Sequence, residues 1–193
     1  LVEAARRVRA GEAVEPNAVL ADTLIAIAGD EALEPAFRAQ ALALPSESDI
    51  ARELGSNNDP DAIRAGREAV LAFIANRGPD VFAKLFESHR TEGAFTADAA
   101  SAGRRALRNA ARNLWIRRAA DLAARGEAPF TQAQHLGDAL GSFIACGAWD
   151  EWRASPTPPA VASELRKALF YVAKYNDGEI LSVRHIARVI ANK

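Results

Sequence analysis

The chain has 193 residues, of which 49% are hydrophobic and 25% are charged, and its formal net charge is −1. That length allows one large domain or two small ones with a buried core, and the balanced charge provides no overall field to attract nucleic acid or an anionic membrane. The single cysteine, Cys146, excludes an internal disulfide and fits a reducing compartment, so we expect a cytoplasmic protein.

No targeting or membrane segment is evident. The chain lacks a run of about 18 apolar residues, so we expect no transmembrane helix. Arg6, Arg7 and Arg9 follow the first apolar residues without an apolar run behind them, which is not the pattern of a signal peptide. The sequence contains no methionine, even at position 1. It therefore either begins inside a longer protein or has methionines missing from it.

The first half predicts a series of short helices, each with its own start signal. They begin at Leu1, Pro16, Pro35, Ser46, Asp59 and Pro79. Ser46 followed by Asp49 is a capping-box-like pair, and Asp59-Pro60 combines a favoured N-cap with proline at the first helical position. The third helix is expected to reach Leu44, where Pro45 stops it.

A turn at Glu92-Gly93 is expected before the helix that carries most of the basic residues. Thr96, with Ala97-Asp98 behind it, is predicted to cap this helix. The helix is expected to run to about Ala124.

The second half keeps the same pattern. Helices are predicted over Thr131–Cys146, Ala160–Tyr175 and Val183–Ala191, and the proline-rich stretch Ser155–Pro159 is the best candidate linker. About twelve short antiparallel helices joined by short loops predict an all-α fold, either an irregular α-solenoid or a superhelical bundle. We expect a helical domain over residues 1–125, and further helices over 126–193 in the same domain or in a second small unit.

No group of residues predicts catalysis. His89, His135 and His185 are not followed by Glu, and one cysteine cannot form a thiolate zinc site. Cys146, beside Ile144, is expected to be a buried and unreactive small hydrophobe. Since a glycine-rich phosphate loop is also missing, we assign neither a metal site nor a catalytic residue, and whether the chain is part of an enzyme stays open.

One concentration of basic side chains stands out on the helix after residue 98. It comprises Arg104, Arg105, Arg108, Arg112, Arg117 and Arg118. Positions 104, 108 and 112 share a helix face, which is most simply a solvated face or one paired with acidic helices. The functional alternative is a positive surface that faces a substrate carboxylate, a partner domain or nucleic acid. We therefore mark Arg104, Arg105, Arg108 and Arg112 as a candidate cavity or partner surface.

Two functions besides that of an enzyme domain are compatible with these patterns. A helical protein-interaction scaffold or regulator would use Trp149, Trp152 and the arginine-rich helix as a partner surface. A DNA-binding regulator would use the two C-terminal helices, Ala160–Tyr175 and Val183–Ala191, as a helix-turn-helix. The neutral net charge argues against the second of these, so nucleic acid is not an expected partner.

Several short motifs follow one another in the first half of the chain. They are Leu33–Arg38, Leu42–Glu47, Asp59–Ile63, His89–Glu92 and Gly103–Asn109. This ordered set, over roughly residues 7–109, resembles the start of the C-terminal helical domain of bacterial aminopeptidase N, the alanyl aminopeptidases of the gluzincin zinc-metallopeptidase superfamily.

The resemblance implies a non-catalytic helical domain or fragment of such a protease. In that family the zinc, its ligands and the general base lie on a separate, earlier catalytic domain, and the helical domain closes over the site and forms the cavity through which peptides pass. The expected partners are therefore the catalytic domain of the same enzyme and the peptide substrate, without a membrane. The chain itself is expected to hold no cofactor.

Overall fold

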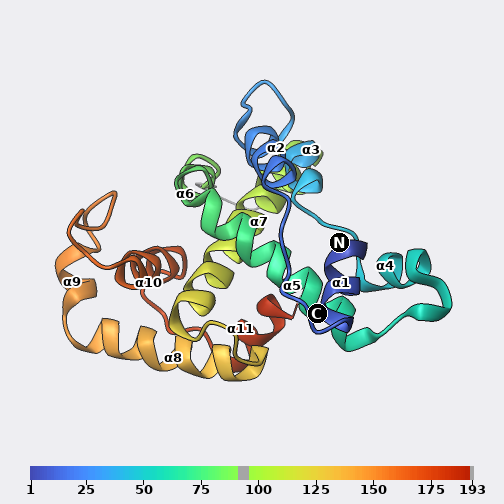
Figure 1. The fold of residues 1–193 in the computed structure, drawn as a ribbon. Coiled ribbons are helices and arrows are strands. Elements are labelled where there is room, and N and C mark those ends of the chain that lie inside the picture. Colours follow the sequence, from blue (N-terminus) through green and yellow to red (C-terminus); the bar gives the residue numbers. More distant parts are fainter. Residues whose placement is uncertain (91–95, 192–193) are drawn as a thin grey trace. The chain divides into compact units, whose positions relative to one another are not determined.

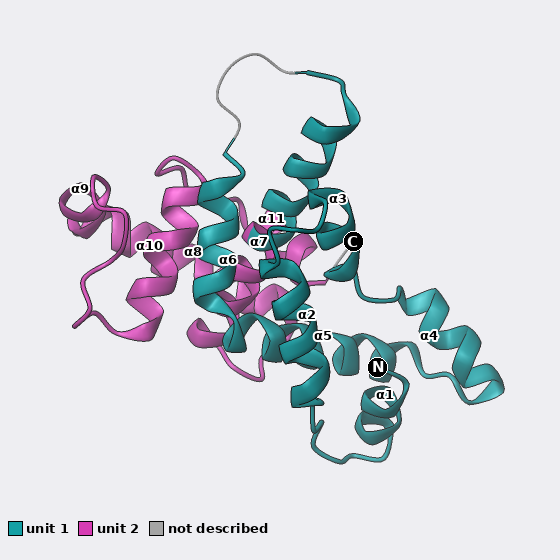
Figure 2. Ribbon diagram, turned by 90° about the horizontal axis from the view of Figure 1, so that it is seen from above, with its two compact units in different colours: residues 1–111 teal, residues 112–193 magenta. Residues whose placement is uncertain are grey.

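The computed structural model describes residues 1–90 and 96–191, and within them the regular structure consists of eleven α-helices and one short 3₁₀ helix (Figure 1). These ranges contain no strand, so the predicted all-α class is confirmed. The chain divides into two compact units, residues 1–111 and residues 112–193 (Figure 2). The division at residue 125 that the sequence suggested stays a prediction. The turn expected at Glu92-Gly93 lies outside the described residues.

Unit 1 contains six helices and the start of a seventh. They are α1 (Val2–Arg9), α2 (Ala18–Gly29), α3 (Pro35–Ala41), α4 (Glu47–Leu54), α5 (Pro60–Arg77), α6 (Pro79–Ser88) and the first part of α7 (Ala99–Ala123), with the 3₁₀ helix over Gly55–Asn57. The capping box at α4 is confirmed, because Ser46 Oγ accepts from the Asp49 amide and Asp49 Oδ2 accepts from the Ser46 amide. Asp59 caps α5 as predicted.

Two predicted helix boundaries in unit 1 are wrong. The helix α3 ends at Ala41 rather than at Leu44, because the backbone of a residue before proline is pushed out of the helical region and the chain turns ahead of Pro45. At α7 the cap is Asp98 rather than Thr96, since Asp98 Oδ1 accepts from the Ser101 amide at 2.8 Å. A carboxylate three residues before that amide has the reach of an N-cap.

The core of unit 1 includes a close crossing of α1 and α5, which lie side by side in Figure 1. Ala5, Ile50 and Ile63 form a buried cluster that brings in α4 as well. Gly66 makes the crossing possible, because a Cβ there would lie 2.7 Å from the backbone nitrogen of Ala5. Small residues on both helices therefore set the distance between α1 and α5.

Unit 2 contains the second part of α7 and four further helices. These are α8 (Pro129–Ala145), α9 (Ala148–Trp152), α10 (Glu164–Tyr175) and α11 (Val183–Ile190). The helix α10 begins four residues later than predicted, because Ser163 is the N-cap and its side chain accepts from the Arg166 amide. Ser182 caps α11 as predicted.

Aromatic side chains build much of the core of unit 2. The Trp115 ring on α7 lies 4.4 Å from that of Tyr171 on α10, measured between ring centroids. Phe143 on α8 meets Trp152 on α9 edge to face at 5.5 Å. Such pairs contribute about 0.5–1.5 kcal/mol beyond the area that they bury. The aromatic residues therefore connect α7 with α10, and α8 with α9.

We expect Gly66→Ala to destabilise unit 1 in spite of the higher helix propensity of alanine. The new methyl group would meet the backbone of α1, and overpacking of this kind costs about 1–3 kcal/mol in the free energy of unfolding. Urea unfolding followed by circular dichroism measures the change.

Gly141→Ala on α8 is the matched control. A Cβ at Gly141 meets only the Ile180 Cδ1 atom at 3.9 Å, so this variant should be neutral or stabilised by up to about 1 kcal/mol. If both variants gained stability equally, the result would contradict the close approach of the α1 backbone to Gly66.

Candidate functional site

The histidines and the cysteine of the chain are the first candidates for a metal or catalytic site. Across residues 1–90 and 96–191, no three His, Cys, Asp or Glu side chains lie together as metal ligands would. His135 is exposed, whereas His89 and His185 are partly buried. Cys146 is exposed, so its predicted burial is wrong. The reason is that α8 ends at Ala145 and leaves Cys146 as the C-cap residue.

Arg104 and Arg105 are used to organise the start of α7. Arg104 Nη2 donates to Ser101 Oγ at 2.7 Å, and Arg105 Nη1 donates to the Thr96 carbonyl at 3.0 Å. Asp98 accepts hydrogen bonds from the amide and from the hydroxyl of Ser101. These two bonds, of which the amide bond has the larger effect, hold the pKa of Asp98 well below its ordinary value of 3.8. The charged carboxylate is therefore part of the N-terminal structure of this helix.

Arg108 and Arg112 contact other helices. The Arg108 guanidinium lies over the Phe86 ring of α6, 4.0 Å from its centroid. Arg112, which belongs to unit 2, donates to Asn176 Oδ1. All four marked arginines are partly buried and have at least one contact within the chain. Their role as a cavity or partner surface stays a prediction.

Four arginines are buried, and three of them, Arg38, Arg67 and Arg117, donate to backbone carbonyls, a role that was not predicted from the sequence. Arg38 Nε donates to the Ala28 carbonyl at the end of α2, at 2.8 Å, and Arg117 Nη1 donates to the Ile190 carbonyl at the end of α11, at 2.5 Å. Arg67 on α5 donates to the carbonyls of Leu44 and Pro45, at 3.3 and 2.9 Å. The signal for Arg67 is its position four residues after Ile63, on the buried face of α5.

The turn that Arg67 holds forms one wall of an apolar groove in unit 1, with a volume of about 650 Å³. The groove lies among α1, α2 and α4, and its apolar lining includes Val2, Leu20, Leu24, Leu44, Pro45 and Ile50. Its charged lining consists of Glu3, Asp49, Glu53 and Arg52. Leu20 is 42% exposed, and its neighbour Val19 is 75% exposed. The groove therefore presents apolar surface within a mostly acidic rim.

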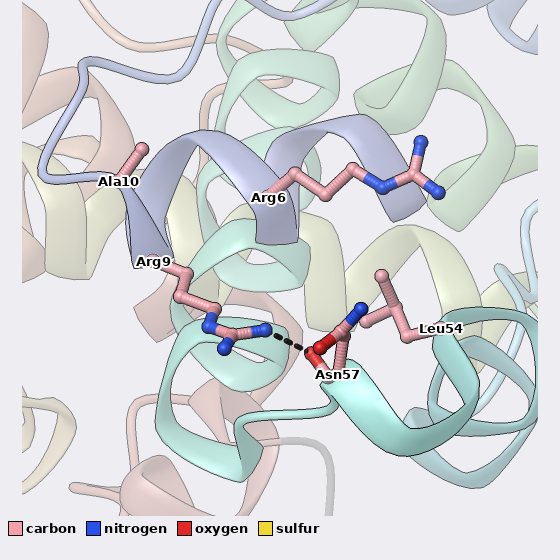
Figure 3. Close-up of a pocket in the computed structure, with 5 residues that line it drawn as sticks. All are labelled: Arg6, Arg9, Ala10, Leu54 and Asn57. Carbon is pink, nitrogen blue, oxygen red and sulfur yellow. Dashed lines mark hydrogen bonds between the residues drawn. The ribbon is translucent and has the colours of Figure 1, made fainter.

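A smaller pocket of about 430 Å³ lies between the end of α1 and the 3₁₀ helix (Figure 3). Arg9 Nη1 donates to the Asn57 carbonyl at 2.6 Å. Figure 3 shows the Arg6 side chain extending away from Arg9. Because the two guanidinium groups do not converge, the pocket is not arranged to hold one anion between them.

The described residues form an all-helical chain in which several arginines, such as Arg38, Arg67 and Arg117, connect one helix to another segment. The chain belongs to the family described as a domain of unknown function (DUF3458_C) with ARM repeats, which residues 1–175 match. It is also similar to Aminopeptidase N from Caulobacter vibrioides, with 41% identity over 124 residues. That match covers 64% of this chain and 14% of the relative.

These findings confirm the resemblance to the C-terminal helical domain of aminopeptidase N, and the ARM-repeat description is consistent with the predicted solenoid. The family match also runs well past Asn109, so it includes more of the chain than the motifs over residues 7–109 indicated. Among the described residues, no helix is long and apolar enough to cross a membrane.

The lowered pKa of Asp98 predicts a pH-dependent contribution to stability. The contribution is fully present above the ordinary pKa of 3.8 and is lost as the pH falls through the lower pKa of the folded state. Wild type should therefore have a higher melting temperature than Asp98→Asn at pH 7, and the difference should shrink as the pH falls below about 4.

Melting temperatures of the two proteins across this pH range, compared at each pH, measure the effect. Other carboxyl groups titrate in both proteins and cancel in the difference. A difference in melting temperature that stayed constant down to the lowest pH would show that the charge of Asp98 does not stabilise the start of α7.

Proposed function

We propose that the chain is a non-catalytic helical domain of an aminopeptidase N-type zinc metallopeptidase, which docks on the catalytic domain and shapes the cavity that admits the peptide substrate. The observation that carries the proposal is the 41% identity to Aminopeptidase N over a segment that covers 14% of that protein. A segment of this size leaves most of the relative outside the match, including room for a separate hydrolytic site. The single cysteine fits a cytoplasmic location.

The apolar groove of unit 1 is the docking surface that we propose for the catalytic domain. Leu20 and Val19 expose apolar area that association would remove from water. Three carboxylates and one guanidinium line the groove, and Glu53 forms no hydrogen bond or ion pair with the described residues. The complementary partner is an apolar segment of the catalytic domain flanked by basic residues.

The two other functions receive less support from the packing. Trp149 and Trp152 are partly buried against Phe170 and Phe143, so they present little free aromatic surface to a partner. Within the described residues, α11 packs mainly on α8 rather than on α10. A helix-turn-helix needs its two helices packed against each other, which makes DNA binding by α10 and α11 the weaker interpretation.

The role of the domain is tested with a truncated form of the Caulobacter vibrioides aminopeptidase that lacks the matching 124 residues. This chain alone, with zinc supplied, should not hydrolyse an alanyl substrate. Added to the truncated enzyme, it should bind and raise the hydrolysis rate, because it would restore the wall of the cavity.

Hydrolysis by this chain alone would overturn its non-catalytic role. An absence of binding to a folded truncated enzyme would overturn docking.

Leu20→Glu should weaken that association, since it places a further carboxylate in the acidic groove and removes apolar contact area. We expect a loss in affinity of about tenfold or more, as for truncation of a central interface residue. Titration calorimetry against the truncated enzyme provides the measurement.

Val161→Glu is the matched control, because Val161 is 96% exposed and belongs to unit 2, outside the groove. The control should bind as wild type does. If both variants lost affinity for the truncated enzyme equally, or if Leu20→Glu lost none, the groove would be excluded as the docking surface.

A further inference from the structure

Unit 2 contains a pocket that the proposed function does not use. It has a volume of about 510 Å³ and lies where α7, the turn after α10 and the start of α11 come together. The side chains that matter for its chemistry are Arg112, Asp177, Glu179, Ile180, Leu181 and His185. Small-molecule sites commonly have volumes of about 300–1,000 Å³ and combine apolar walls with a few polar groups. This pocket has that size, but its lining is mostly polar, with apolar side chains only at Ile180 and Leu181.

The basic side of the pocket is held in place by hydrogen bonds. Arg112 donates to Asn176 Oδ1, and Asn176 Nδ2 in turn donates to the Val172 carbonyl at 2.6 Å, in the last turn of α10. The guanidinium is thus oriented by a side chain that is itself fixed to a helix end. An arginine held in this way can bind a carboxylate with little loss of conformational entropy.

His185 places a buried nitrogen beside this arginine. Its Nε2 atom is shielded from solvent and has no hydrogen-bond partner among the described residues. Burial is the main cause that lowers the pKa of His185, followed by the charges of Arg112 and Arg188, so the ring is neutral at pH 7. Because Nε2 is shielded from solvent, the imidazole contributes to the wall of the pocket, and its Nε2 is not presented to a ligand there.

The acidic side of the pocket consists of Asp177 and Glu179 in the turn between α10 and α11. Their backbone amides are used within the turn, to the carbonyls of Lys174 and Asn176. Neither carboxylate forms a hydrogen bond or an ion pair with the described residues. The two negative charges are therefore available to a cationic group of a ligand.

The separation of these groups argues for a ligand larger than an ion. Although Asp177, Glu179 and His185 line one pocket, the described residues contain no set of three such groups that could hold a metal. A molecule with charges of both signs can instead contact the carboxylates and the guanidinium at the same time. Ile180, which is 54% exposed, and Leu181 add apolar surface beside them.

We propose that this pocket binds a zwitterionic α-amino acid with an apolar side chain. Its carboxylate accepts from the Arg112 guanidinium. Its ammonium group donates to Asp177 and Glu179, and its side chain packs on Ile180 and Leu181. The inference does not rest on the proposed function, because it concerns binding by unit 2 alone and involves no hydrolysis.

The test uses L-leucine as the probe and the whole chain, by titration calorimetry and by NMR shifts of backbone amides, at concentrations up to about 10 mM so that millimolar affinities are detected. We expect saturable binding, with shifts centred on residue 112 and residues 176–185. L-leucinamide lacks the carboxylate, and N-acetyl-L-leucine lacks the charged amine. Each should bind at least about tenfold more weakly than L-leucine, because each loses one charge-assisted contact.

Asp177→Asn with Glu179→Gln tests the acidic side. Asparagine tolerates the positive φ of 53° at position 177, so the turn should be kept. The double variant should bind L-leucine about tenfold more weakly, whereas its affinity for the anionic N-acetyl-L-leucine should not fall, because two repelling negative charges are removed. Glu127→Gln, outside the pocket, is the control and should bind as wild type does.

Three results would overturn the proposal. They are an absence of L-leucine binding, equal affinities for L-leucine and L-leucinamide, and a double variant that binds L-leucine as tightly as the control does.

Discussion

Hydrogen bonds from buried arginines to backbone carbonyls are the interaction on which the helix packing depends. The last carbonyls of an α-helix have no partner within the helix, and burying them unpaired is costly. Arg38 reaches such a carbonyl at the end of α2, and Arg117 reaches one at the end of α11. A long side chain with several donors can satisfy an oxygen on another helix while its aliphatic part packs in the core. The arginines thus compensate for helix ends that lie inside the protein.

The same interaction shapes the surface on which the proposed function depends. Arg67 holds the carbonyls of Leu44 and Pro45, and those two residues line the apolar groove. The segment Leu42–Glu47, which carries part of the family resemblance, therefore has a structural reason for its shape. A rigid turn beside exposed apolar side chains can present a preformed surface to a partner, which lowers the entropy lost on docking.

Alanine and glycine set the distances between the helices. At Gly66 the backbone of α1 approaches α5 so closely that no side chain fits between them. In unit 2, large rings such as those of Trp115 and Tyr171 fill the space between helices instead. The two units thus use small residues in one case and aromatic residues in the other, within one family match. Among the described residues, neither kind of packing brings three His, Cys, Asp or Glu side chains together as metal ligands would.

The sequence by itself determined the all-α class, most helix starts and the family. Caps and prolines act within three or four residues, so Ser46, Asp59 and Ser182 could be recognised without knowledge of the fold. Tertiary structure alone decided which arginines are buried, because Arg117 and its partner Ile190 are 73 residues apart. The pocket of Arg112 and His185 depends on a contact of the same kind, between α7 and the turn before α11. Local chemistry specifies where a helix begins, whereas the partner of a long side chain is specified only once the helices have packed.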